Sequence, residues 1–142
     1  MNPTSNNKEA ASADVESLSR QVALPIRPAE AVWQQEALGK QNSNVPGPVD
    51  YRLIAVLKYN AADARTLIEK VGGDSKQTPA GEVEVETWFP EEVKKLARKG
   101  EDGAMVEGAK YDPEAFLRAP YSSGKLVRVG ETNYFVLKIF SF

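Results

Sequence analysis

The tetrapeptide Ser122-Ser123-Gly124-Lys125 has the S-x-x-K spacing in which a lysine amine activates a serine hydroxyl as a nucleophile. That chemistry requires the serine at the N-terminus of a helix, with the lysine one turn later on a buried face. Pro120 precedes the tetrapeptide and Gly124 interrupts it, which favours a turn over a helix. We therefore expect a connection that leads into a strand, and no catalytic role.

Three glutamates, Glu82, Glu84 and Glu86, alternate with apolar residues and fall on one face of a predicted strand, at steps of roughly 7 Å. A straight strand cannot converge its own carboxylates on one point, as a calcium site requires. A pair of catalytic carboxylates would need a second strand, for example Glu84 with Glu107. The pattern favours a solvated face, a face paired with nearby lysines, or a surface that binds a partner.

Aromatic side chains near these glutamates and in the C-terminal segment complete the binding surface that the sequence predicts. The expected partner-binding residues are Glu82, Glu84, Glu86, Trp88, Tyr121 and Tyr134. Arg118, Lys125, Arg128 and Lys138 also lie near tyrosines, a combination typical of single-stranded nucleic-acid binding. Because the net charge is −2 and the aromatic residues are needed for a core, we expect a protein partner and no nucleic acid.

The composition excludes several kinds of chemistry. Among 142 residues there is no His and no Cys, so disulfides, thiol nucleophiles, zinc fingers and Ser-His-Asp catalysis are ruled out. Gly72-Gly73-Asp74-Ser75 follows a predicted helix instead of opening one, so it is a helix end and not a phosphate-binding loop. We expect no enzyme activity, no cofactor and no metal.

Residues 1–30 read as a polar N-terminal tail or arm, with a short helix in which Val15, Leu18 and Val22 share a face. Residues 31–142 read as one domain. Its predicted strands and helices are strand 31–38, strand 51–59, helix 60–72, strand 82–88, helix 90–99, strand 105–111, a short helix from 112, and a hairpin of 126–129 with 134–142.

The predicted order gives an α+β fold with a mostly antiparallel sheet and two to three short helices on one face. The connection from strand 51–59 to strand 82–88 is long enough for a parallel crossover. In the last strand, Phe135, Leu137 and Ile139 should be buried. We expect the other sheet face to be open, and partly screened by segment 31–38 with Trp33 as its anchor.

No secretory signal and no membrane span of roughly 20 apolar residues is found in the sequence. Met1 either starts the protein or replaces a removed export signal, with the polar tail as the spacer of a lipid-anchored or secreted domain. We expect a non-enzymatic protein-interaction domain of binding, inhibitor or immunity type, in a bacterial periplasmic or extracellular protein. The alternative is a structural component of a phage particle or other assembly, cytoplasmic or in the virion, with an ordered N-terminal arm. A carboxylate-based hydrolase is the third function hypothesis. The sequence does not decide whether the chain forms a homo-oligomer.

Overall fold

The computed structural model describes residues 11–37, 50–72, 80–100 and 103–141. Strands and short helices alternate along these residues. They are α1 (Val15–Gln21), β1 (Glu30–Ala37), β2 (Tyr51–Lys58), α2 (Ala61–Gly72), β3 (Ala80–Glu84), α3 (Glu91–Lys94), β4 (Arg98–Gly100), β5 (Gly103–Tyr111), the 3-10 turn η1 (Glu114–Phe116), β6 (Ser123–Arg128) and β7 (Tyr134–Phe140).

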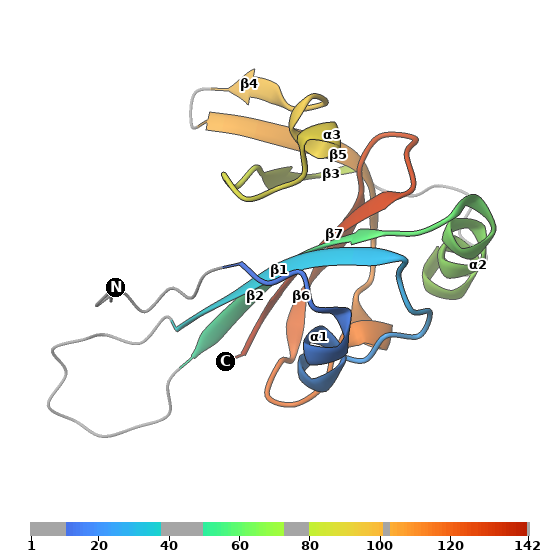
Figure 1. Ribbon diagram of the computed structural model, residues 1–142, viewed down its shortest axis with the longest axis vertical. Helices are drawn as coiled ribbons and strands as arrows, with labels where there is room; N and C mark the ends of the chain where they lie inside the picture. Colours follow the sequence, from blue (N-terminus) through green and yellow to red (C-terminus); the bar gives the residue numbers. More distant parts are fainter. Residues whose placement is uncertain (1–10, 38–49, 73–79, 101–102, 142) are drawn as a thin grey trace, which may run out of the picture.

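Seven strands form one sheet in the order β1-β2-β7-β6-β5-β3, with β4 paired to β5 beside this path (Figure 1). Every pairing among the described residues is antiparallel. The predicted α+β class with a mostly antiparallel sheet is therefore confirmed. The parallel crossover between strands β2 and β3 does not occur, because β2 and β3 lie at different places in the sheet and are not neighbours.

Short helical elements cover one side of the sheet, which we call the helical face. Leu18 of α1, Leu67 of α2 and Phe116 of η1 are fully buried, and they pack in one cluster with sheet residues. The sheet contributes alternate residues of its central strands to this cluster, namely Leu53, Ala55, Leu57, Phe135, Leu137, Ile139 and Leu126. The predicted burial of Phe135, Leu137 and Ile139 is confirmed, since each has no exposed surface.

The other side of the sheet, which we call the opposite face, is covered in part by a second layer. This layer holds β3, β4, α3 and the first part of β5, because β5 pairs with β3 and β4 before it reaches β6 (Figure 1). Between the two layers lies a smaller core made of Ile54, Val56, Val83, Phe89, Val93, Val106, Val127, Val129 and Val136. The opposite face is therefore closed over its valines and open beyond them, as Tyr134 and Phe140 at the two ends of β7 are only half-buried.

The helix predicted over residues 90–99 is wrong in its second half. Helix α3 ends at Lys94, and Arg98–Gly100 pair with the first residues of β5 as strand β4. Leu96, which a helix over residues 90–99 would place beside Val93 on the buried side, is 48% exposed. Residues 98–100 form backbone hydrogen bonds with β5 that they could not form inside a helix. Tertiary pairing therefore overrides the local helical pattern.

The N-terminal arm is attached to the sheet from Ser12 onward. Asp14 caps α1 by accepting a hydrogen bond from the Glu16 backbone N–H at 3.0 Å. Ser12 and Trp33 exchange backbone hydrogen bonds of 2.7 and 2.8 Å along the outer edge of β1. Trp33 is half-buried against the helical-face core, and its indole N–H donates to the Asp14 carbonyl at 3.1 Å. It thus anchors the arm from the helical face and does not screen the opposite face.

Candidate functional site

The six residues predicted to bind a partner do not form one surface. Glu82 and Glu84 are exposed on β3, and Glu86 and Trp88 follow in the turn before α3. Tyr121 lies in the helical-face core with 3% of its surface exposed, and its hydroxyl accepts a 2.5 Å hydrogen bond from Gln35 Nε2. Tyr134 is on the opposite face. Tyr121 is therefore buried in the helical-face core and does not share a surface with the other five residues.

The predicted alternation holds for Glu82 and Glu84, which are exposed on either side of buried Val83. It fails for Glu86, because β3 ends at Glu84 and residues 85–88 do not continue the predicted strand. Glu82 stands directly across from Glu107 of β5. Glu107 in turn pairs with Arg98 of β4, with Nη1 to Oε2 at 2.6 Å, and both side chains are largely exposed. An ion pair in such contact with water contributes little to stability, so this face is a solvated mixture of charges.

Trp88 faces the molecule and not the solvent. Its ring packs edge-to-face on Phe89, with centroids 4.9 Å apart, against the core between the layers. The indole N–H is buried and has no hydrogen-bond partner within the described ranges. Trp88 is therefore a packing residue of the second layer.

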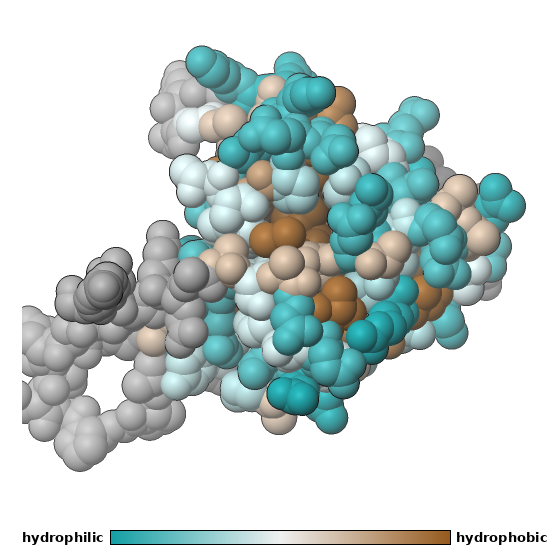
Figure 2. Space-filling view, in the orientation of Figure 1, coloured by the Kyte–Doolittle hydropathy of each residue, from teal (hydrophilic) through white to brown (hydrophobic). Residues whose placement is uncertain are grey.

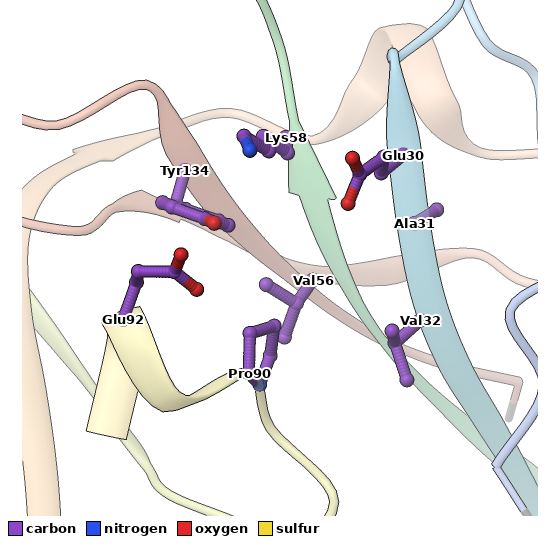
Figure 3. A pocket seen from close by; sticks show the side chains of 8 residues that line it. All are labelled: Glu30, Ala31, Val32, Val56, Lys58, Pro90, Glu92 and Tyr134. Atoms are coloured by element: carbon purple, nitrogen blue, oxygen red, sulfur yellow. The ribbon is translucent and has the colours of Figure 1, made fainter. Parts of the chain in front are cut away.

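A pocket of about 260 Å³ opens between the sheet and the beginning of α3, and it includes Tyr134 (Figure 3). Its apolar part comes from Ala31, Val32, Val56 and Pro90. Figure 2 shows apolar residues in the middle of the molecule, between the second layer and β1, where this pocket lies. Its polar rim is made of Glu30, Lys58, Glu92 and Tyr134.

Strand register brings three of the four rim residues together. Glu30 of β1 is the direct partner of Lys58 in β2, and Lys58 is the partner of Tyr134 in β7. The next row of the same face, Val32 with Val56, supplies the apolar part. Glu92 comes from α3, placed over this row by burial of Val93 in the core between the layers.

The rim has a defined electrostatic arrangement. Burial raises the pKa of Tyr134, the Lys58 ammonium lowers it, and the carboxylates of Glu92 and Glu30 raise it further. Tyr134 therefore keeps its proton at neutral pH, with the Glu92 carboxylate beside it in the same pocket. The Lys58 ammonium lies 5.8 Å from the centre of the Tyr134 ring. Two carboxylates against one ammonium leave the rim with a formal charge of −1.

Sequence reasoning identified Tyr134 and missed Glu30, Lys58 and Glu92. Each is an ordinary charged residue in its local pattern, and only the pairing of β1, β2 and β7 shows that they meet. Within the described residues, no group of three or more His, Cys, Asp or Glu side chains is placed to hold a metal ion. No helix in that part of the chain is long and apolar enough to cross a membrane.

Comparisons of this chain with models of protein families, with curated proteins and with solved structures found no match.

Proposed function

We propose that this protein is a non-enzymatic protein-binding domain that receives a basic side chain of its partner in the pocket of Glu30, Lys58, Glu92 and Tyr134. The observation that carries the proposal is the combination of an apolar wall with an acidic, aromatic rim in one pocket. Pockets that join apolar surface to a few convergent polar groups are the usual form of a binding site.

A lysine or arginine side chain matches both parts of this pocket. Its aliphatic stem packs on apolar surface while its charged end reaches polar groups at the rim. Val32 and Pro90, which are only half-buried, offer that apolar surface, and the Glu92 and Glu30 carboxylates offer acceptors. Because the rim carries a net negative charge, a basic side chain complements it better than an acidic one does.

A binding function also agrees with the residue types that the chain contains and lacks. The chain has no His and no Cys, the commonest general base and the most reactive nucleophile at neutral pH. The Tyr134 hydroxyl, whose pKa is raised, serves as a hydrogen-bond donor. We further propose that the protein is an exported or lipid-anchored bacterial domain, a hypothesis that rests on the composition of its polar N-terminal segment.

The arm of a structural assembly protein would pack on a neighbouring subunit. Here the arm residues Leu18 and Val22 are fully buried in the core of their own domain. This packing favours the binding domain over the phage or assembly component.

The pocket also supports a second candidate, a carboxylate-based hydrolase, because Glu30 and Glu92 line the same pocket from different elements. Glycoside hydrolysis uses two such carboxylates. Turnover of chromogenic glycosides by the wild-type chain, lost in both Glu30→Gln and Glu92→Gln, would support this candidate against simple binding.

Titration of the ¹⁵N-labelled protein with short peptides tests the binding proposal. Each arginine-containing peptide is compared with the same peptide carrying citrulline, which keeps the shape and removes the charge. Arginine peptides should shift the amide signals of residues 30–32, 56–58, 92 and 134, with Kd several-fold lower than for citrulline. Glu92→Gln should remove most of that difference, whereas Glu69→Gln, on an exposed position of α2, should leave it intact. Equal affinity for the two peptides, or equal loss in both variants, would overturn the proposal.

A further inference from the structure

A second hollow of about 460 Å³ lies on the same face of the sheet, beyond the other end of β7. It is lined by Lys110 of β5, by Ser123, Gly124 and Lys125 of β6, and by Lys138 and Phe140 of β7. Three ammonium groups from three neighbouring strands therefore border one space, with a formal charge of +3.

Strand register fixes these lysines beside one another. Lys125 is the direct cross-strand partner of Lys138, and Lys110 is paired with Val127, the residue two positions after Lys125 on the same face. Like charges directly opposite each other on paired strands destabilise a sheet. The fold therefore maintains an arrangement that works against its own stability.

The surroundings neutralise this charge only in part. None of the ion pairs found among the described residues includes Lys110, Lys125 or Lys138. The Lys125 ammonium donates a 2.6 Å hydrogen bond to the backbone carbonyl of Glu82, a neutral acceptor. Burial lowers the pKa of Lys125, the charges of Lys138 and Lys110 lower it further, and the Glu82 carboxylate opposes them.

Protection of a sheet edge does not account for the cluster. Lysines often stand on edge strands, where they discourage pairing with other chains. β7 lies between β2 and β6, so Lys138 is on an interior strand. Lys125 pairs with β7, whereas β5 pairs with β6 only at Leu126 and Val127. An interior lysine that stands directly against a second lysine beside a hollow needs another reason to persist.

We propose that the hollow of Lys110, Lys125 and Lys138 binds a small ligand that carries two or more oxyanion groups, either phosphates or carboxylates. Such a ligand accepts charge-assisted hydrogen bonds from the three ammonium groups, with the Ser123 hydroxyl as a further donor at the rim. Bound oxyanions turn the repulsion between Lys125 and Lys138 into joint attraction. The site is separate from the pocket of Tyr134 and does not depend on the function proposed for it.

Thermal unfolding of the full chain with tripolyphosphate, citrate or inorganic phosphate, each matched in ionic strength with sodium chloride, tests this site. Tripolyphosphate or citrate at millimolar concentration should raise the unfolding midpoint by several degrees, and inorganic phosphate by less. A larger effect of tripolyphosphate identifies phosphates as the ligand groups, and a larger effect of citrate identifies carboxylates. No stabilisation by any of the three beyond the chloride control would overturn the proposal.

Lys138→Gln separates a binding site from a chance group of lysines. Without ligand this variant should unfold about 1–3 °C higher than the wild type, because the repulsion with Lys125 is gone. In calorimetric titration its affinity for the polyanion should fall at least tenfold. Lys99→Gln, an exposed lysine opposite Ala104, should change neither quantity. An equal loss of affinity in Lys99→Gln would show nonspecific charge attraction and refute the site.

Two further variants serve as a replacement for Lys138→Gln and as a control for the pocket of Tyr134. Lys125→Gln should reproduce the loss of affinity if Lys138→Gln fails to fold. Glu92→Gln, which tests the pocket of Tyr134, should leave polyanion binding unchanged. Failure of one proposal is therefore distinguishable from failure of the other.

Discussion

Replacement of Leu137 by alanine tests whether β7 is the centre of the fold. Leu137 has no exposed surface and lies in the helical-face core. Its cross-strand partners are Ala55 in β2 and Leu126 in β6. The partner on one side is already an alanine, and both neighbouring strands are fixed by their own pairing. The site therefore has little capacity to collapse around a smaller side chain.

The expected cost follows from the atoms removed. Loss of three buried carbon groups costs about 2.4 kcal/mol in transfer free energy, at about 0.8 kcal/mol for each. The unfilled cavity adds to this, so the free energy of unfolding should fall by about 3–4 kcal/mol, within the range of buried leucine-to-alanine changes. For a chain of this length such a loss lowers the thermal midpoint by about 10–15 °C.

Urea unfolding followed by far-ultraviolet circular dichroism measures this loss directly. The midpoint should move to lower urea while the slope stays unchanged, which shows a change in stability and not in the unfolded state. Leu96→Ala is the matched control, because the same atoms are removed from a side chain that is 48% exposed. It should cost less than about 1 kcal/mol. A loss below about 1.5 kcal/mol for Leu137→Ala, or equal losses for both variants, would refute the assignment of β7 as the core strand.

Three other substitutions test separate features. Gly108→Ala would place a Cβ 1.8 Å from the backbone carbonyl oxygen of Arg128, which cannot move aside as a side chain can; urea unfolding should show a loss of about 2 kcal/mol. Tyr59→Phe removes the hydroxyl that donates to the Ile26 carbonyl at 3.0 Å, and should cost about 1–2 kcal/mol by the same assay. Asp14→Ala should lower the thermal midpoint at neutral pH. The hydrogen bond from the Ser17 hydroxyl lowers the pKa of Asp14 below 3.8, so this difference from wild type should vanish as the pH falls through that lower value.

The controls for these variants come from the same structure. Gly130 has φ +53° and nothing within 4 Å of an added Cβ, so Gly130→Ala should show only backbone strain, about 1 kcal/mol. A Gly108→Ala variant no less stable than Gly130→Ala would contradict the close approach of β5 to the β6–β7 turn. For Asp14, a difference that persists unchanged at pH 2 would show that the carboxylate is not what stabilises α1.

Local patterns predicted most of the elements, because each is specified by neighbouring residues. Residues 51–59 carry apolar side chains on both faces, and β2 lies in the interior of the sheet with both faces buried. Asn60 is a residue type favoured at helix N-termini, and its Oδ1 accepts a 2.8 Å hydrogen bond from the Asp63 N–H. The helix of residues 15–22 and the hairpin of β6 with β7 were found for the same reason.

Predictions failed where distant pairing competes with local preference. The charges and apolar spacing of residues 90–99 favour one helix, and nothing local marks residues 98–100 as a strand. The pairing of Arg98 with Met105 needs β5 beside it. The opposite face was expected to be open, but its valines are buried. They are covered by the second layer, in which β3 and β4 pair with the first part of β5.

Composition and alternation along the chain were enough to predict the class of the fold, the core-facing residues of the central strands, and the chemistries that a chain without His and Cys cannot perform. Which charged residues meet became visible only in the assembled sheet. Glu30, Lys58 and Tyr134 share a row because β1, β2 and β7 pair in one register, and Lys125 stands against Lys138 because β6 and β7 do. Period-two alternation tells which side of a strand a residue occupies, whereas its cross-strand neighbour depends on strand order and register, which arise only when the whole sheet assembles.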